Sequence, residues 1–189
     1  MATTLEDEKS ARLTEAAQHH DGPVGAGALV RAYYRNVAAE DVCERGPHDL
    51  YRALASHLEL ARVRPQGTAR VRVVTPVEGE GWSTGGHSTV QVVTDDMPFL
   101  VDSLTMELAN QDWDVRVVIH PQMDVERDIT GELRRVSAVE DGSVAAPEGA
   151  IRESWMQIEI TRVSDDEDAA ALEESLQRVL SDVREAVED

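Results

Sequence analysis

Hydrophobic residues in the first third of the chain recur with the spacing of α-helices. Residues 5–18 have a weak apolar periodicity that predicts a polar helix. Stronger stripes, with an apolar side chain every three or four positions, run through residues 24–38 and through the segment that begins at Pro47, and they predict two amphipathic helices. We therefore divide this part of the chain into a flexible or helical arm at 1–23 and a helical hairpin at 24–64.

The pattern then changes to the alternation of β-strands. Residues 69–75 and 88–94 alternate in the strand manner on either side of a glycine-rich stretch, which predicts an antiparallel hairpin with a long loop. Further along, the sequence predicts a helix at 98–111, strands at 113–119, 121–127, 133–138 and 153–161, and a long C-terminal helix opened by a capping box at 164–167.

From residue 88 onward, the predicted order is β-α-β-β-α, which is the ferredoxin-like order without its final strand. The strand at 69–75, paired with 88–94, would fill the vacant position in the sheet. We expect residues 65–189 to form an α+β domain in which two helices cover one face of an antiparallel sheet. The other face is left for the N-terminal helical hairpin or for a partner subunit.

Charge and composition exclude several classes of function. The chain has 37 acidic and 18 basic residues and a formal charge of −19, which repels nucleic acid and anionic membrane surfaces. Cys43 is the single cysteine, so the chain can form neither an internal disulfide nor a cysteine-based metal cluster. It has no signal-peptide pattern and no apolar run long enough to cross a membrane. We expect a cytoplasmic protein without nucleic acid or membrane partners.

Side chains with possible chemistry gather where the second predicted strand gives way to the next helix, in the phrase TDDMPFLVDS. Asp95, Asp96 and Asp102 could bind a cation or act as an acid and a base, but the simpler interpretation is that Asp95 or Asp96 caps the helix. Asp102 and Ser103 could instead line a small-molecule pocket, and Phe99 suggests a packing anchor at a subunit interface. The candidate effector or interface site thus consists of Asp95, Asp96, Met97, Phe99, Asp102 and Ser103.

Two further patterns are weaker. The segment at 25–30, GAGALV, opens a helix with a glycine pair as a dinucleotide fingerprint does, but no hydrophobic strand precedes it and Val30 occupies the place of the third small residue. None of the 6 histidines forms the i, i+4 pair of a helical metal site, and the neighbours His19 and His20 point in different directions on a helix. We predict no catalytic, cofactor-binding or metal-binding residue in this chain.

The phrase DMPFLV at 96–101 is similar to the Asp-x-Pro-Gly-Leu pattern at the first strand-to-helix turn of ACT domains, the small-molecule-sensing modules of amino-acid metabolism. Phe99 stands where those domains have glycine, and a phenylalanine would crowd an effector that approaches the backbone. The longer phrases TDDMPFLVDSLTMEL and VVIHPQMDVERDITGEL, together with residues 32–62, resemble the N-terminal region of the large bacterial NAD-specific glutamate dehydrogenases. This resemblance extends over residues 24–188.

The resemblance implies an ACT-like regulatory or assembly domain that is itself non-catalytic. The parent enzyme would deaminate L-glutamate to 2-oxoglutarate and ammonia, with NAD bound in a distant catalytic domain. The partners would be the rest of that chain, its homo-oligomer and an amino-acid effector. A stand-alone small-molecule-binding or protein-interaction domain is the alternative, and a stand-alone enzyme built on the three aspartates is a third hypothesis.

Overall fold

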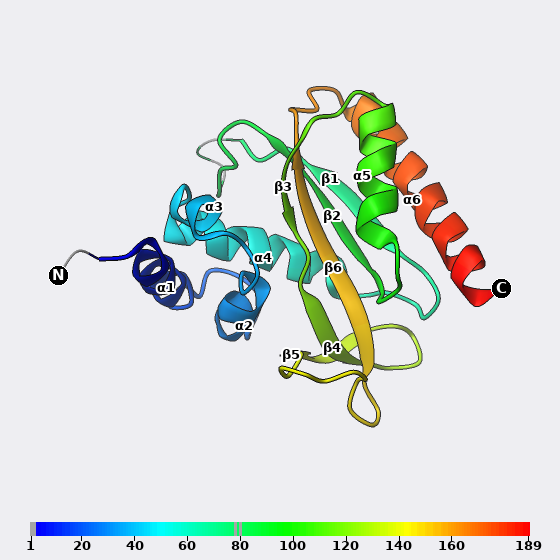
Figure 1. Cartoon of the computed structure of the whole chain (residues 1–189), viewed down its shortest axis with the longest axis horizontal. Helices are drawn as coiled ribbons and strands as arrows, with labels where there is room; N and C mark the ends of the chain where they lie inside the picture. The colour runs from blue at the N-terminus through cyan, green and yellow to red at the C-terminus, as the bar shows by residue number, and fades with distance from the viewer. Residues whose placement is uncertain (1–2, 78, 80) are drawn as a thin grey trace.

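A six-stranded antiparallel sheet forms the centre of the computed structural model, which describes residues 3–77, 79 and 81–189. A layer of helices lies on each side of the sheet (Figure 1). The prediction of an α+β fold with an antiparallel sheet is confirmed. In chain order the elements are α1 (Leu5–Ala16), α2 (Ala26–Tyr33), α3 (Ala39–Cys43), α4 (Pro47–Ala61), β1 (Arg70–Val74), β2 (Ser88–Asp95), α5 (Leu100–Asn110), β3 (Val115–Ile119), β4 (Gln122–Arg127), β5 (Leu133–Ala138), β6 (Ile151–Ile160) and α6 (Asp166–Glu188).

The first hairpin occupies the sheet position that the sequence left vacant. The strand order is β1-β2-β6-β4-β5, and β3 also pairs with β6. Arg70 of β1 lies opposite Val93 of β2, and the antiparallel pairing continues to Val74 and Thr89. The prediction that the strand at 69–75, here β1, fills the place of the final strand of the ferredoxin-like order is therefore confirmed.

β3 and β4 together form one interrupted strand that pairs with β6. Ile119 lies opposite Gln157 and Gln122 lies opposite Ser154, so the pairing register is the same before and after the break. Pro121 interrupts the line because it has no N–H to donate, although its carbonyl oxygen still accepts a hydrogen bond of 3.0 Å from a backbone N–H of β6. On its other edge β4 pairs with β5.

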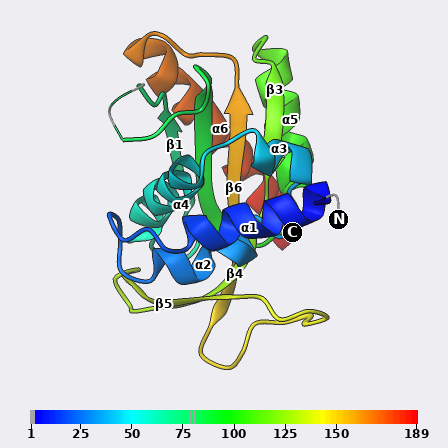
Figure 2. The same ribbon diagram turned by 90° about the vertical axis from the view of Figure 1, so that its left-hand side faces the viewer.

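Successive residues of the strands point to opposite faces and give the molecule two hydrophobic cores. Val92 of β2 and Met156 of β6 belong to the core under α5 and α6. Their neighbours Val93 and Trp155 belong to the core under the N-terminal helices, whose side of the molecule faces the viewer in Figure 2. The chain's own helices therefore cover the second face of the sheet, as one of the two predicted arrangements requires.

The N-terminal arm is helical and packed against this second core. The Thr4 hydroxyl accepts a hydrogen bond from the Asp7 N–H at 3.1 Å, and the Asp7 carboxylate accepts one from the Thr4 N–H at 3.1 Å, which forms a capping box for α1. Leu13 and Ala16 of α1 are buried in the same core as the sheet residues. The boundaries at residues 23 and 64 stay predictions.

α2 is shorter than the helix predicted at 24–38. It ends at Tyr33, and the turn that follows is bound by Lys9 of α1. The Lys9 ammonium donates hydrogen bonds to the carbonyl oxygens of Arg35 and Val37 at 3.2 and 2.6 Å. A side chain thus satisfies polar groups that a longer helix would pair internally, which accounts for the early end.

Candidate functional site

The six candidate residues at the start of α5 do not form a single site. One set lines a groove between α5 and α6, and a second set accepts hydrogen bonds from arginines or from side chains of the sheet. The groove set is Phe99, Asp102 and Ser103, the hydrogen-bonded set is Asp95 and Asp96, and Met97 is partly buried against the core under α5 and α6.

Neither Asp95 nor Asp96 caps α5. The N-cap position is Phe99, and within the described part of the chain no side-chain hydrogen bond caps the helix. Asp95 instead accepts hydrogen bonds from Arg64 Nη2 at 2.7 Å and from Arg184 Nη2 at 2.9 Å. The capping prediction is wrong because two arginines from distant parts of the chain offer Asp95 charge-assisted hydrogen bonds, which are among the strongest in proteins.

Asp95 is the outer end of a buried ion network. Arg64, which is 0% exposed, donates to Glu153 Oε1 through Nε and Nη2 at 2.8 and 2.7 Å. Arg127 donates to both oxygens of Glu153 at 2.7 and 3.0 Å, and Trp155 Nε1 donates to Oε2 at 2.9 Å. These donors compensate the removal of the carboxylate from water. Sequence reasoning missed this network, and the one local signal for it is a charged residue on the same strand face as Trp155.

Asp96 is fixed by a second set of hydrogen bonds. Ser154 Oγ donates to Asp96 Oδ1 at 2.6 Å, and Gln122 Nε2 donates to Oδ2 at 2.9 Å. His120 Nε2 lies 3.0 Å from Ser154 Oγ, and burial lowers the pKa of this histidine. Ser154 is within hydrogen-bond distance of both Asp96 and His120, but it is fully buried, so a substrate cannot reach its hydroxyl. These bonds hold the turn before α5 against the sheet.

The helix α6 also begins differently from the prediction. Asp165, and not Ser164, is its N-cap residue, and the Asp165 carboxylate accepts a hydrogen bond from the Glu167 N–H at 2.7 Å. The predicted capping box at 164–167 is therefore wrong: the cap lies one position later, and its carboxylate bonds to the second residue of the helix rather than the third. The acidic first turn that was predicted is present, since Asp166, Glu167 and Asp168 follow the cap.

The groove between α5 and α6 has a volume of about 520 Å³ and is lined by apolar side chains and carboxylates. Phe99 and Met106 are 69% and 64% exposed, respectively. Asp102, Glu107 and Asp182 contribute carboxylates, and none of the described residues that line the groove is basic. Such a surface suits an apolar partner segment with basic residues at its edge.

Phe99 combines an unfavourable backbone with an exposed aromatic side chain. Its φ of 67° and ψ of 6° lie in the left-handed region, at the position where the ACT pattern has glycine. A residue with a Cβ is less stable in this conformation by roughly 1–2 kcal/mol. Burial does not offset this strain, because most of the side chain is in solvent.

We expect Phe99→Gly to be more stable than Phe99→Ala by roughly 1 kcal/mol, because only glycine relieves the left-handed backbone. Wild type and Phe99→Ala should differ by no more than about 0.5 kcal/mol, since the side chain is largely exposed. Urea denaturation of the three proteins measures both differences. Equal stability of the glycine and alanine variants would show that the backbone at residue 99 is not strained.

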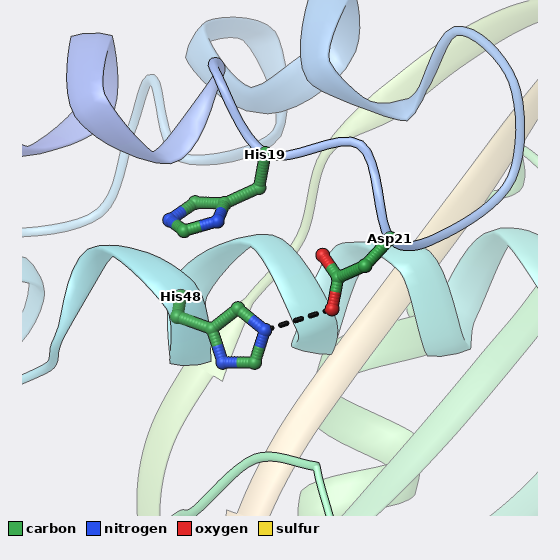
Figure 3. A group of neighbouring side chains, drawn as sticks. All are labelled: His19, Asp21 and His48. Atoms are coloured by element: carbon green, nitrogen blue, oxygen red, sulfur yellow. Dashed lines mark hydrogen bonds and ion pairs between the residues drawn. The ribbon is translucent and has the colours of Figure 1, made fainter.

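A group of side chains that sequence reasoning did not connect lies between the α1–α2 linker and α4 (Figure 3). His19 and Asp21 come from the linker and His48 from the first turn of α4, and one ligand atom of each lies within 4.8 Å of the others. The hydrogen bond from His48 lowers the pKa of Asp21. The distance in sequence explains the omission, because Asp21 and His48 are 27 residues apart. Within the described part of the chain, the aspartates at 95, 96 and 102 form no such group.

The glycine pair of the segment GAGALV has a role in packing. Gly25 is the N-cap residue of α2 and has a φ of 86°. A Cβ atom on Gly27 would lie 2.4 Å from the carbonyl oxygen of Ala17, so the chain passes close to α2 at this point. The element before α2 is the helix α1 and not a strand. The segment therefore lacks the strand-to-helix context of a dinucleotide site.

Gly27→Ala should destabilise the protein by roughly 1–3 kcal/mol, because the new methyl group overlaps a backbone oxygen that cannot move independently of the linker. Gly46→Ala is the matched control, since its Cβ would meet only the Asp49 carboxylate at 3.4 Å. Chemical denaturation compares the two variants with wild type. A Gly27→Ala protein as stable as the control would mean that this helix approach is looser than described.

Comparisons with known proteins agree with the fold. The family model for the ACT1 domain of glutamate dehydrogenase matches residues 29–176. The chain is 36% identical to the NAD-specific glutamate dehydrogenase of Halomonas elongata over 158 residues, which is 83% of this chain and 10% of the relative. It is 30% identical to the Pseudomonas aeruginosa enzyme of the same name over 158 residues, which is 83% of this chain and 9% of the relative.

The Mycobacterium tuberculosis enzyme of that name is 29% identical over 136 residues, which is 72% of this chain and 8% of the relative. The chain thus spans a tenth or less of the length of these relatives. No solved structure matches it. Among the helices of the described residues, none is long and apolar enough to span a membrane. The predicted resemblance is confirmed, and the chain belongs to the ACT1 domain family of glutamate dehydrogenases.

Proposed function

We propose that this sequence is an N-terminal regulatory and assembly domain of a cytoplasmic, homo-oligomeric NAD-specific glutamate dehydrogenase, and that it does not itself catalyse the reaction. The match covers a tenth of the Halomonas elongata relative, so glutamate and NAD would bind in other parts of the enzyme. The parent reaction would convert L-glutamate and NAD to 2-oxoglutarate and ammonia. The domain would act through contacts with the rest of that chain.

The observation that carries the proposal is Phe99, which lines the groove between α5 and α6. A partner that buries Phe99 would offset the strain of its backbone, because burial of a full aromatic side chain contributes a free energy of several times RT. Nine-tenths of the length of the Halomonas elongata relative lies outside the match and can supply that partner. We assign the groove to an apolar segment of the remaining dehydrogenase chain with basic residues at its edge.

Charge favours this assembly role over the binding of an amino-acid effector in the same groove. A free amino acid carries a carboxylate, and the groove presents three carboxylates of its own and no basic side chain among its described lining residues. Asp102 and Ser103 could bind the ammonium group, but the effector carboxylate would have no partner. Isothermal titration with single amino acids should therefore give no heat, and a titratable signal lost in Asp102→Asn would restore the effector hypothesis.

Two experiments test the wider proposal. The purified chain should show no glutamate-dependent reduction of NAD, because Asp95 and Asp96 are each held by hydrogen bonds from other side chains. Turnover that disappears in Asp96→Asn would overturn the non-catalytic assignment.

The gene offers the second test. A reading frame that continues past codon 189 into a long coding sequence supports a domain of a dehydrogenase, and a stop codon there would favour the stand-alone alternative.

A further inference from the structure

We propose that His19, Asp21 and His48 form a binding site for Zn²⁺ that fastens the α1–α2 linker to α4. The three side chains are close enough to share one ion, since one ligand atom of each lies within 4.8 Å of the other two. Asp21 Oδ2 and His48 Nε2 are already 2.9 Å apart. The two imidazole rings meet edge to face with their centroids 5.0 Å apart (Figure 3).

The linker is held in place independently of any ion. Arg52 Nη1 donates a hydrogen bond of 2.7 Å to the backbone carbonyl of Asp21. The next residue, Gly22, lies so close to α4 that a Cβ would be 2.9 Å from both Ala55 and the Tyr51 hydroxyl. These contacts fix the backbone that carries Asp21 against the helix that carries His48. The ligands therefore start from a nearly assembled arrangement, which limits the entropy lost on binding.

Two imidazole nitrogens and one carboxylate oxygen are a ligand set that zinc accepts, with a water molecule in the fourth position of a tetrahedron. Ligand bonds of about 2.0–2.1 Å bring the donor atoms closer together than the 4.8 Å that separates them at most in this structure. The His19 side chain would therefore rotate towards Asp21 and His48 when the ion binds. The side chains of His48 and Asp21 are 45% and 53% exposed, which gives an ion access from solvent. Bound metal would replace the hydrogen bond between these two residues by bonds to all three.

Titration of the 189-residue chain with Zn²⁺, in protein purified without a polyhistidine tag, tests the site. We expect one ion to bind per chain and to raise the melting temperature. Loss of a direct ligand in His19→Ala or His48→Ala should weaken binding by at least about 100-fold, since even loss of a partner behind a ligand weakens metal sites 10–100-fold. His20→Ala is the matched control and should bind as wild type does.

Two further measurements keep the test independent of folding. Asp21→Asn changes an exposed side chain, so it should weaken zinc binding while the circular dichroism spectrum stays that of wild type. Substitution by Co²⁺ should give the visible absorption of a tetrahedral site in wild type and in His20→Ala but not in His48→Ala. Zinc that binds wild type no more tightly than a His19→Ala/His48→Ala double variant would overturn the proposal.

Discussion

Glu153→Ala is expected to lower the free energy of unfolding by roughly 3–5 kcal/mol, which corresponds to a fall of roughly 10 °C in melting temperature for a chain of this size. The substitution leaves Arg127, whose side chain is 5% exposed, without its carboxylate partner, and it leaves the fully buried Arg64 with Asp95 alone. It also removes the acceptor of the Trp155 indole N–H. Unpaired charge in a core is far less favourable than a complete network, so the loss greatly exceeds that of an ordinary ion pair.

The control for this prediction is an ion pair at the surface of the same sheet. Glu126 and Arg135 form a pair on β4 and β5 with side chains that are 37% and 68% exposed. Glu126→Ala should change stability by less than about 1 kcal/mol. Thermal and urea unfolding of both variants provide the measurement. A Glu153→Ala protein that loses no more stability than Glu126→Ala would mean that water reaches the network.

The second large effect concerns acid stability and depends on His57. This residue is fully buried on α4, where its Nε2–H donates to the Val92 carbonyl at 2.9 Å and its Nδ1 lies 2.7 Å from the Tyr33 hydroxyl. Burial lowers the pKa of His57 to about 4, and the positive charge of Arg72 acts in the same direction. Because the ordinary pKa is about 6.5, the unfolded chain binds a proton that the folded chain excludes between these two values.

The stabilisation from neutral His57 is therefore complete above pH 6.5 and decreases as the pH falls towards 4, by roughly 3 kcal/mol in total. His57→Gln should remove this part of the pH dependence, so the difference in stability between wild type and variant should shrink on acidification. His20→Gln changes an exposed histidine and should keep the slope of wild type. Urea unfolding at several pH values tests this, and parallel curves for wild type and His57→Gln would contradict it.

Local pattern was sufficient to predict the sheet hairpin and the order of its elements. The strands at 69–75 and 88–94 alternate over most of their length and flank a glycine-rich loop, which is enough to predict an antiparallel hairpin. The register that places Arg70 opposite Val93 needed the structure, because β2 is buried on both faces. The continuity of β3 and β4 was harder to predict. This continuity is visible only in the pairing of both strands with β6. The sequence around Pro121, taken by itself, predicts two separate strands.

The site was predicted less well, because its important contacts join distant parts of the chain. Arg64 and Glu153 are 89 residues apart, and Asp95 and Arg184 are also 89 residues apart. From the neighbouring residues alone, Asp95 is predicted to cap the helix that follows it. Its contact with an arginine of α6 cannot be predicted from that segment. The importance of Phe99 was visible in sequence as a departure from glycine, but its strained backbone and its exposure needed the structure.

Hydroxyl-radical footprinting of Phe99 and Met106 gives the most direct test that the rest of a dehydrogenase covers the groove between α5 and α6. Both side chains are exposed in the 189-residue chain, while Met123 is fully buried and provides the baseline. In the full-length enzyme that contains this sequence, we predict that oxidation of Phe99 and Met106 slows towards the rate of Met123, while exposed Ile129 keeps its reactivity. Oxidation of Phe99 and Met106 at the same rate in both proteins would contradict the assembly role.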